Sequence, residues 1–407
     1  MESKNRIVIV SCVFPPEPLV SARISEAIAE RLSKDMDVVV LCPAPTRPVG
    51  RLWSRDTSEY LNYEVVTLDS YTCPESKIFG RFKESYSFGK AVARYVSDNH
   101  DSIKAIYANT HPTFGQYLLL KAAEKYDIPC IVHIQDLYPE SLTSKLGIIG
   151  RAANEMLVKF DARHMRKARK LIAISGDMKT ALAMTRNYSP DNIEVIYNWQ
   201  DERKFLKHRG PTDSGGKFTF MFLGNINPTA NIPTVIHAFG RLGNKDSRLI
   251  IAGSGAEKPK CMEIASSYPE SEIIFRDVLP DEVPSVQSQA DVLLLPLLKG
   301  ISRTAMPSKL PAYMFSAKPV LACVEADSDV GRAITESECG WISEPEDITA
   351  LSKIMEKCIG TPRRQLLEMG DKGKAFGIKK FSTEVNLGKI CNLIKNLSDG
   401  SENIITG

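Results

Sequence analysis

The sequence predicts an α/β protein of two doubly wound domains, each with a parallel sheet, and three observations support this prediction. Short runs of β-branched residues alternate with longer stretches of helical period, which is the pattern of parallel βαβ units. The alternation stops in a polar, glycine-containing stretch after Asn198 and then resumes. The length of 407 residues is sufficient for two domains with cores of their own.

The first domain is predicted over residues 1–200. Its first strand is RIVIVSC (6–12), and a helix follows over 21–35, where Ile24 and Ile28 recur on one face. The run MDVVVLCP then returns as a strand. Further strands are predicted at AIYAN (105–109), CIVHIQ (130–135), KLIAIS (170–175) and IEVIYN (193–198).

The second domain is predicted over residues 201–378, and residues 379–407 are predicted to form a C-terminal helix that packs back on the first domain, followed by a tail. Its strands are predicted at FTFMFLG (218–224), RLIIAG (248–253), EIIFRD (272–277), ADVLLLPL (290–297) and KPVLACV (318–324). Open α/β sheets bind ligands beyond the carboxyl ends of their strands. We therefore expect a ligand-binding cleft between the two sheets.

Composition excludes several classes of protein. The hydrophobic content of 43% and the charged content of 25% are those of an ordinary soluble protein. A net charge of +3 gives no support for nucleic-acid binding. Nine cysteines without a CxxC pair indicate reduced thiols in the cytosol rather than disulfides or a zinc site. The first residues do not resemble a signal peptide, and the longest apolar runs are too short to span a membrane.

Two glycine-containing turns follow strands of the second domain, in FLGNINPTAN (222–231) and IAGSGAE (251–257). Glycine allows a ligand to approach the backbone closely, although one such turn is equally typical of an ordinary connection between a strand and a helix. Two of them in one domain favour a ligand. The candidate ligand-binding residues in these turns are Gly224, Asn225, Asn227, Gly253 and Gly255.

A third candidate segment, RTAMPSKLPAYMF, begins at Arg303. Pro307 or Ser308 is predicted to open a helix, because proline suits the first turn, and the N–H groups and dipole at that end favour an anion. Lys309 and Arg303 add cationic side chains suited to phosphate. The alternative is a capped surface helix with incidental basic residues.

Seven stretches in a fixed order carry a resemblance to a known family. They are VFPPEPLVSARISEAIAERLSKDMDVVVLCP, HIQDLYPESL, IEVIYNWQDERKF, FLGNIN, IAGSG, ADVLLLPL and PSKLPAYMFSAKPVLA. Together they resemble the family 4 retaining glycosyltransferases of the GT-B architecture, whose two Rossmann-like domains face each other across a cleft. The most similar subgroup builds bacterial surface polysaccharides and has DLWPES, NWxD and PSK…Y…GKPV motifs. The resemblance spans nearly the whole chain.

The resemblance implies transfer of a hexosyl or N-acetylhexosaminyl group from a nucleotide diphosphate donor, with a UDP-sugar favoured, to an acceptor held by the N-terminal domain. It implies that Lys309 and Arg303 neutralise charge on the leaving diphosphate, which makes Lys309 a catalytic residue. It also implies retention of configuration without a divalent metal or another cofactor. The implied acceptor is a saccharide, such as a polyprenyl-diphosphate-linked one in capsule, O-antigen or exopolysaccharide assembly.

Polar residues after two strands of the first domain are the candidate acceptor contacts. Glu17, Ser21 and Arg23 follow the first strand, with an ordinary solvent-exposed helix start as the alternative. Asp136 and Glu140 in HIQDLYPESL end a central strand, where a carboxylate can orient or deprotonate the acceptor hydroxyl. Asp136 is the preferred catalytic carboxylate, and a role in capping the next turn is the alternative.

The sequence departs from the family pattern at the site. Family members commonly carry two glutamates eight positions apart, and Thr304 and Ala312 stand at these positions, so both carboxylates are missing. Thr304 remains a candidate donor contact. Near the first helix, Leu19 and Val20 replace a glycine-rich pair, which narrows the acceptor pocket or shapes it for a different acceptor.

The stretch KFDARHMRKARK (159–170) holds six basic residues and one acid in a chain that is otherwise close to balanced. As one helix it would present a broad basic side, with Phe160 and His164 toward another. Together with KIFGRFKESYSFGK (77–90), it predicts a cytoplasmic protein in peripheral, salt-sensitive contact with anionic lipid on the inner face of the cytoplasmic membrane. A solvated helix face is the alternative.

Two other functions are compatible with the same fold. A non-catalytic nucleotide-sugar binder would account for the loss of both family glutamates, and a nucleotide-sugar epimerase also uses two Rossmann-like domains. The DLYPES, NWQD and PSK elements favour a transferase. Slow hydrolysis of a nucleotide sugar without acceptor would distinguish an enzyme from a binder.

Overall fold

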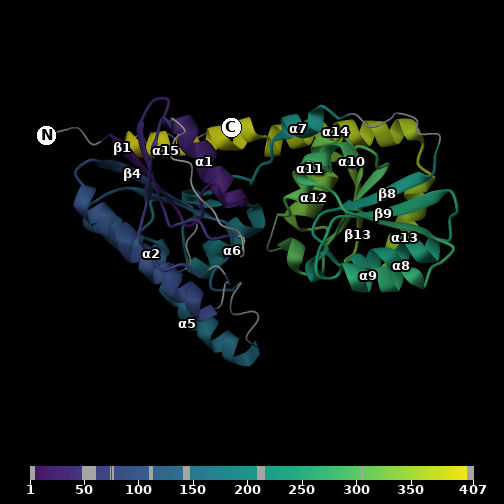
Figure 1. Cartoon of the computed structure of the whole chain (residues 1–407), viewed down its shortest axis with the longest axis horizontal. Coiled ribbons are helices and arrows are strands. Elements are labelled where there is room, and N and C mark those ends of the chain that lie inside the picture. Colours follow the sequence, from purple (N-terminus) through teal and green to yellow (C-terminus); the bar gives the residue numbers. More distant parts are fainter. Residues whose placement is uncertain are drawn as a thin grey trace. The chain divides into compact units, whose positions relative to one another are not determined.

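The computed structural model describes residues 5–47, 61–73, 75, 78–109, 113–140, 147–208, 216–303 and 306–400 (Figure 1). The chain forms two compact units. Unit 1 comprises residues 1–196 and 387–407, and unit 2 comprises residues 197–386. Each unit is built on one parallel sheet, which confirms the predicted fold class.

Unit 1 has a seven-stranded sheet in the order β3-β2-β1-β4-β5-β6-β7. Its strands are β1 (Arg6–Ser11), β2 (Asp37–Cys42), β3 (Glu64–Thr67), β4 (Ile103–Asn109), β5 (Cys130–Ile134), β6 (Lys170–Ala173) and β7 (Ile193–Val195). In the centre, Ile9 lies opposite Val40 of β2 and Tyr107 of β4. The central strands are almost wholly buried, as expected for a parallel sheet with helices on both faces.

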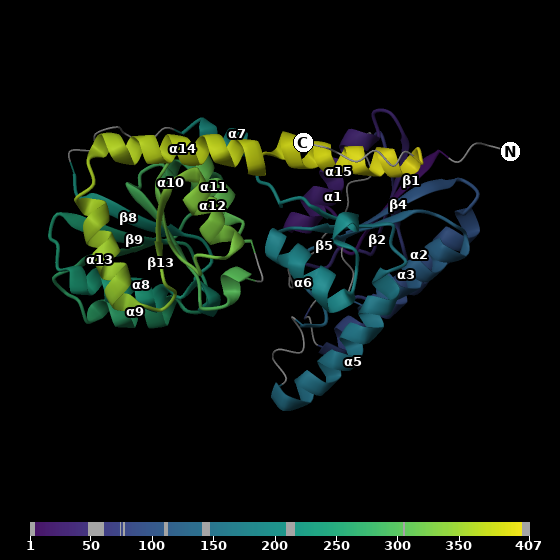
Figure 2. The ribbon, with the colours of Figure 1, turned by 180° about the vertical axis from the view of Figure 1, so that it is seen from behind.

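Helices cover both faces of the unit 1 sheet. They are α1 (Val20–Leu32), α2 (Ile78–Asn99), α3 (Thr113–Lys125), α5 (Gly147–Met165), α6 (Gly176–Arg186) and most of α15 (Thr383–Ser398). Residues of α2, α3, α5 and α6 share one core with strand residues such as Val8 and Val10. On the opposite face lie α1 and α15 (Figures 1 and 2).

Unit 2 has a six-stranded parallel sheet in the order β10-β9-β8-β11-β12-β13. Its strands are β8 (Phe218–Leu223), β9 (Ser247–Ala252), β10 (Glu272–Arg276), β11 (Val292–Pro296), β12 (Val320–Cys323) and β13 (Gly340–Ser343). Its helices are α7 (Glu202–Leu206), α8 (Ile232–Leu242), α9 (Lys258–Ser266), α10 (Val283–Gln287), α11 (Lys309–Phe315), α12 (Asp329–Ser337), α13 (Ile348–Ile359) and α14 (Arg363–Phe381).

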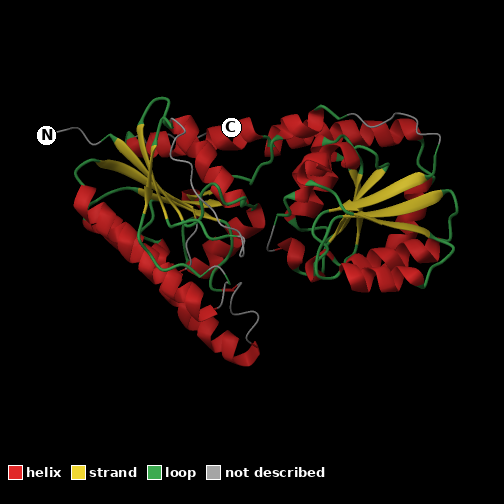
Figure 3. Cartoon of the chain, viewed as in Figure 1, coloured by secondary structure: helices red, strands yellow, loops and turns green. Residues whose placement is uncertain are grey.

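Helices flank both faces of the unit 2 sheet (Figure 3), and each face buries a separate core. Met221 packs with residues of α10, α11 and α12, whereas its neighbour Phe220 packs with residues of α8 and α13. Successive strand residues point to opposite faces, so a strand covered on both sides is largely apolar, as FMFL (220–223) of β8 is.

Several elements differ from their prediction. The short edge strands β3 and β13 escape it because each has four residues and is only partly buried. The polar stretch after Asn198, where the predicted alternation stops, contains α7, whose Phe205 is buried beside Phe315 at a ring distance of 6.4 Å. The basic stretch 159–170 is not one helix, because α5 ends at Met165 and β6 begins at Lys170. All nine cysteines lie within the described residues, and none of them forms a disulfide there.

Candidate functional site

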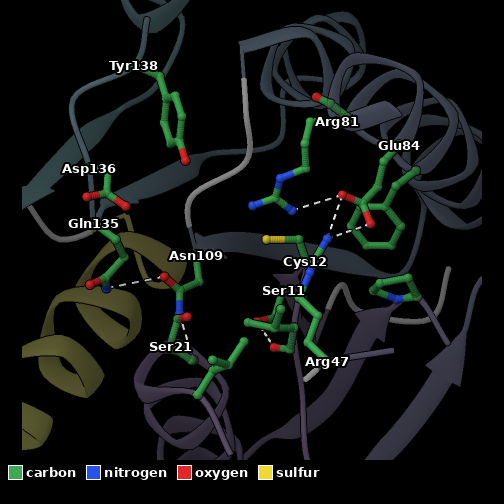
Figure 4. Close-up of a pocket in the computed structure, with 15 residues that line it drawn as sticks. Ser11, Cys12, Ser21, Arg47, Arg81, Glu84, Asn109, Gln135, Asp136 and Tyr138 are labelled. Atoms are coloured by element: carbon green, nitrogen blue, oxygen red, sulfur yellow. Dashed lines mark hydrogen bonds and ion pairs between the residues drawn. The ribbon is translucent and has the colours of Figure 1, made fainter. Parts of the chain in front are cut away.

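The strand order of unit 1 reverses between β1 and β4, and ligands of doubly wound sheets bind at such a point. A pocket of about 170 Å³, here named the unit 1 pocket, opens there beyond the carboxyl ends of β1, β2, β4 and β5 (Figure 4). Its lining residues are Ser11, Cys12, Val13, Leu19, Ser21, Pro43, Arg47, Arg81, Glu84, Ser85, Phe88, Asn109, Gln135, Asp136 and Tyr138.

Hydrogen-bonded polar side chains at the strand ends form the floor of the unit 1 pocket. The hydroxyl groups of Ser11 and Ser25 are 2.9 Å apart. Asn109 donates to the Ser25 hydroxyl at 3.0 Å and to the Ser21 carbonyl at 2.9 Å, and Gln135 donates to Asn109 at 3.3 Å. Because these groups satisfy one another, the floor is held in place without a ligand.

His133 lies behind this floor, inside β5, and is fully buried. Its Nδ1 is 2.7 Å from the hydroxyl of Tyr107, and its Nε2 is 3.2 Å from the amide nitrogen of Gln135. Burial lowers the pKa of His133 to about 3, so the imidazole is neutral at physiological pH. His133 therefore supports Gln135 from the core and does not face the pocket.

Two arginines enter the unit 1 pocket on one side. Nη2 of Arg47 is 2.7 Å from each carboxylate oxygen of Glu84, and Nη1 of Arg81 is 2.9 Å from Oε2 of the same carboxylate. In Figure 4 the Arg81 guanidinium reaches toward the middle of the pocket. One carboxylate thus serves two guanidinium groups, so this side of the pocket is positive.

Asp136 and Tyr138 form the opposite side (Figure 4). Within the described residues, neither the Asp136 carboxylate nor the Tyr138 hydroxyl has a hydrogen-bond or ion-pair partner. The Asp136 residue is exposed at the mouth of the pocket. The protein around its carboxylate nevertheless reduces the hydration of the charged form, and this raises the pKa of the carboxyl. Burial also raises the pKa of Tyr138, with the Asp136 charge adding to the shift and the Arg81 charge opposing it. An unpaired carboxylate with a raised pKa can accept a proton.

The structure brings some of the predicted acceptor residues into the unit 1 pocket and not others. Ser21 and Asp136 line it. Arg23 is exposed on α1 and lies outside the lining. Glu17 is a correction: it is buried, and its carboxylate accepts the backbone N–H of Arg47 at 2.8 Å. Glu17 therefore positions the segment that carries Arg47 instead of facing a ligand.

Glu140 is a second correction, because its carboxylate pairs with Arg186 at 2.5 and 2.8 Å. The Arg186 side chain is fully buried and is also 2.8 Å from Asp161. Its Nη2 donates to the Tyr138 carbonyl at 2.5 Å. Glu140 thus compensates a buried cation, and Arg186 fixes the segment that carries Tyr138.

The strand order of unit 2 reverses between β8 and β11, and the two glycine turns meet at this edge of the sheet. Gly224 and Gly253 have φ of 146° and 132°. A Cβ on Gly253 would lie 2.1 Å from the Gly224 oxygen, and one on Gly255 would lie 2.2 Å from the Ile226 oxygen. Only glycine allows the loops after β8 and β9 to approach so closely.

Lys309 fills the space beside Gly224. A Cβ on Gly224 would lie 2.1 Å from Cε of Lys309, whose ammonium is 4.4 Å from the ring centroid of Phe222. In the described part of the chain this ammonium has no hydrogen bond or ion pair. Burial lowers the pKa of Lys309 to about 8. A half-buried cation without an anionic partner, next to a glycine turn, is suited to bind an anion.

The helix that carries Lys309 begins later than predicted. α11 starts at Lys309 itself, so Pro307 lies before the helix and Ser308 is its N-cap, without a side-chain hydrogen bond. The carbonyl of Pro307 accepts the N–H of Leu310 at 3.1 Å, which closes a turn ahead of the helix. A proline is compatible with this turn as well as with a first helical position, so the sequence does not separate the two.

Two contacts hold α11 at the end of β8. The amide of Gln200 donates to the Ser308 carbonyl at 2.8 Å. The hydroxyl of Tyr313 is 3.1 Å from both the backbone N and the backbone O of Leu223. The Tyr313 contact gives a structural reason for the tyrosine after PSK.

The remaining predicted donor residues are partly engaged. Arg303 is exposed and pairs with Asp327 at 2.6 Å. Thr304 lies outside the described residues. The side chain of Asn227 accepts the N–H of Ala230 at 3.0 Å and caps a short 3₁₀ turn, whereas Asn225 is exposed. The side-chain oxygen of Asn227 is therefore used within its own loop.

Sequence reasoning missed Arg47, Arg81, Tyr138 and Arg186. Arg81 lies in KIFGRFKESYSFGK, which the sequence assigns to membrane contact. Tyr138 lies inside the HIQDLYPESL motif, next to the predicted Asp136, and that position could have identified it as a site residue. The signal for Arg186 is its spacing of four from Leu182, which puts a charge on the buried face of α6.

The described residues contain neither a candidate metal site nor a membrane-spanning helix. No three His, Cys, Asp or Glu side chains in these ranges are grouped so that they could hold a metal ion. No helix among them combines the length and the apolar character needed to cross a membrane.

Comparison with known proteins gives matches for both units. A model described as glycosyltransferase family 4 matches residues 21–204, and one described as glycosyl transferases group 1 matches residues 217–360. A curated relative, the probable glycosyltransferase WbjE of Pseudomonas aeruginosa, is 24% identical over 294 residues, or 70% of this chain and 72% of that protein.

Solved structures share the fold of the whole chain. Anabaena Alr3699/HepE in complex with UDP has a TM-score of 0.69 at 16% identity, over 96% of this chain and 100% of that one. WaaG, a glycosyltransferase involved in lipopolysaccharide biosynthesis, has a TM-score of 0.66 at 13% identity, over 95% and 99%. At these identities the likeness establishes the fold alone.

Proposed function

The chain belongs to the family 4 glycosyltransferases of the GT-B fold, and we propose that it transfers a sugar from a nucleotide diphosphate donor to a saccharide acceptor with retention of configuration. Unit 2 binds the donor, and unit 1 binds the acceptor in the unit 1 pocket. The donor is a UDP-sugar, because structures of Alr3699/HepE hold UDP and UDP-glucose.

The observation that carries this proposal is the ammonium of Lys309, half-buried beside Gly224 and without a hydrogen bond or ion pair in the described part of the chain. A diphosphate next to the glycine turns would supply the missing negative charge. Negative charge on the diphosphate grows as it leaves, so a cation held there stabilises the transition state more than the ground state. Gly224, Asn225, Asn227, Gly253, Gly255, Arg303, Thr304, Pro307 and Ser308 remain the proposed neighbours of the donor.

In the transfer step, the acceptor oxygen bonds to the anomeric carbon as the bond from that carbon to the diphosphate oxygen breaks. The electron pair leaves with the nucleoside diphosphate. Asp136 accepts a hydrogen bond from the acceptor hydroxyl and orients it, and the proton passes to Asp136 or to the leaving phosphate. The raised pKa of the unpaired Asp136 carboxyl supports this role.

Donor binding must proceed without the two family glutamates. Position 312 offers no carboxylate, because it is an alanine that is buried in α11. Its backbone carbonyl accepts a hydrogen bond from the side-chain amide of Gln287 at 2.6 Å. We assign the stabilisation of the leaving group to Lys309 and to backbone N–H groups, without a metal ion.

The relatives support the proposed class of acceptor. WaaG is involved in lipopolysaccharide biosynthesis, and the motifs of this chain resemble those of transferases for surface polysaccharides. A polyprenyl-diphosphate-linked saccharide in capsule, O-antigen or exopolysaccharide assembly fits both. Such an acceptor brings the enzyme to the inner face of the cytoplasmic membrane.

Peripheral contact with anionic lipid is supported by exposed residues of α2 and α5. Lys159 and Arg163 on α5 are exposed, and Phe79 on α2 is 89% exposed. Phe160 packs against Tyr117 of α3 at a ring distance of 5.3 Å, so the aromatic side of α5 faces the protein and its basic side faces solvent. Not all of the predicted basic residues contribute, because Lys167 pairs with Glu124.

A panel of UDP-, GDP-, ADP- and TDP-sugars tests the donor assignment through thermal shift, since a ligand at a hundred times its Kd adds about 2.7 kcal/mol of stability. Slow release of free sugar from the stabilising donor, with the anomer identified by NMR, tests both the enzyme class and retention. Failure of every nucleotide sugar to stabilise the protein would contradict the proposal.

Sedimentation with vesicles that contain anionic lipid tests the membrane contact. We expect binding at low salt and release at high salt. Charge reversal at Lys159 and Arg163 should abolish sedimentation, whereas charge reversal at Lys245, exposed in unit 2, should not. A protein that stays in the supernatant at both salt concentrations has no such contact.

A further inference from the structure

Arg47 and Arg81 have no part in the transfer step described above, although both enter the unit 1 pocket. Their side chains are 14% and 30% exposed, and both pair with the single carboxylate of Glu84, which is 13% exposed. Charges withdrawn from water are normally matched one to one. Among the described residues, the two guanidinium groups therefore carry one positive charge more than the carboxylate that pairs with them. The nearby Glu17 carboxylate accepts backbone N–H groups and pairs with neither guanidinium group.

The surplus hydrogen-bond donors point to the same space. Nε of Arg47 is buried and has no hydrogen-bond partner among the described residues. Arg81 uses Nη1 for Glu84, and its Nε and Nη2 have no partner among the described residues. The Tyr138 hydroxyl, also without a partner in these ranges, points into the pocket from the other side (Figure 4).

Asp136 does not neutralise this surplus, because the described structure contains no ion pair between Asp136 and either arginine. The pocket therefore has two chemically different sides. One holds a carboxylate that can accept a hydrogen bond from a hydroxyl group, and the other holds donors without acceptors.

We propose that the acceptor carries an anionic group, a phosphate or a carboxylate, which binds Arg81, Arg47 and the Tyr138 hydroxyl while the reacting hydroxyl faces Asp136. This inference rests on the proposed function and specifies its substrate class. A planar guanidinium binds two oxygens of a phosphate or a carboxylate at once, which gives orientation as well as affinity. A neutral sugar would leave the surplus charge unmatched.

The same anion chemistry could come from the donor diphosphate, and the experiment separates the two sources. Isothermal titration calorimetry is performed on the full chain with UDP at saturation, so that the donor site is occupied, and with ionic strength held constant by chloride. The probes are inorganic phosphate, glucuronate and, as the uncharged comparison, glucose. We expect phosphate or glucuronate to bind and glucose not to bind.

Three variants assign the bound anion to the pocket. Arg81→Gln should weaken anion binding about tenfold to a hundredfold, because it removes charged hydrogen bonds. Glu84→Gln should strengthen anion binding, because it removes the carboxylate that competes for both guanidinium groups. Arg94→Gln, on the same helix but 85% exposed, is the matched control and should change nothing.

The proposal is overturned if UDP-saturated protein binds neither anion, or if glucose binds as well as glucuronate. It is also overturned if Arg81→Gln keeps its anion affinity while Lys309→Ala loses it, because the anion would then lie at the donor site. Arg81→Lys, which keeps the charge but loses the planar fork, should retain part of the affinity and replaces Arg81→Gln if that variant does not fold. Failure of the proposed function would appear separately, as the absence of UDP-sugar binding and hydrolysis in the unmodified chain.

Discussion

The two units place different kinds of binding surface at equivalent points of similar sheets. In unit 1, between β1 and β4, the surface consists of side chains such as Arg81, Asp136 and Tyr138. In unit 2, between β8 and β11, it consists largely of backbone around Gly224 and Gly253, with one cation, Lys309. The point where the strand order reverses is thus lined by side chains in unit 1 and mostly by backbone in unit 2.

This difference matches two recognition tasks. Every nucleoside diphosphate sugar presents the same diphosphate, which glycine turns and one lysine can bind whatever the base or the sugar. Acceptors differ from one another, and side chains on loops can change without disturbing the sheet that holds them. We therefore expect substitutions in unit 1 to affect the acceptor step and substitutions in unit 2 to affect donor affinity.

The largest effect is expected from Asp136→Asn. The neutral amide accepts a weaker hydrogen bond from the acceptor hydroxyl than a carboxylate does and cannot take its proton, so kcat should fall by about 10²- to 10⁴-fold while UDP affinity stays unchanged. Steady-state kinetics and calorimetry with UDP measure the two quantities, and Asp98→Asn, exposed on α2, serves as the control. If UDP affinity falls and kcat does not, Asp136 serves the donor and the division between the units is wrong.

Arg186→Met should have the largest effect on stability. It leaves the carboxylates of Asp161 and Glu140 without their buried partner, and breaking a buried pair in this way costs about 3 to 5 kcal/mol. Because the cluster lies in unit 1, urea unfolding should separate into two transitions, and only the transition of unit 1 should shift. Arg364→Met, at an exposed pair in unit 2, should leave both unchanged. A single transition that shifts as a whole would mean that the units do not unfold independently.

Gly224→Ala and Lys309→Ala should both weaken UDP binding, by about tenfold to a hundredfold. The first moves the lysine that the second removes, because an added Cβ would lie 2.1 Å from Cε of Lys309. Gly243→Ala isolates the backbone strain, since Gly243 also has a positive φ of 61° but no atom within 4 Å of an added Cβ. If all three variants bind UDP as tightly as the unmodified protein does, Lys309 does not belong to the donor site.

The smallest effect is a pH dependence confined to unit 2. Burial lowers the pKa of Lys309 to about 8, so the free protein loses this positive charge as pH rises through 8. The diphosphate is already fully ionised there, because its last pKa lies near 6. UDP affinity should therefore fall up to about tenfold per pH unit above 8 and stay level in Lys309→Arg, whose side chain remains charged. A decline of the same slope in Lys309→Arg would place the titrating group elsewhere.

The sequence predicted the parts of the fold that repeat a strong local pattern. The buried strands β1, β2, β4 and β5 were found because their residues are apolar on both faces. The edge strands β3 and β13 were not, because short and half-exposed segments lack that pattern.

The candidate site was less predictable, because its side chains come from distant segments. Arg81 and Glu84 are three residues apart on α2, a spacing that the sequence can reveal. Arg47 reaches the same carboxylate from the segment after β2, and no local spacing encodes that contact. The two glutamates placed in the site, Glu17 and Glu140, were misplaced for a common reason. Each follows a strand end as a catalytic carboxylate would, but the fold uses it to satisfy donors of its own.

The environment of Lys309 has a consequence for chemical labelling. With a pKa of about 8, roughly a fifth of its side chains are neutral amines at pH 7.4, against about a thousandth for an ordinary lysine. Amine-selective acylating reagents attack only the neutral form, so Lys309 should be modified ahead of the exposed lysines wherever the reagent can reach it. UDP would protect it by restoring the proton, and mass spectrometry of the labelled peptide could therefore report donor occupancy without any knowledge of the acceptor.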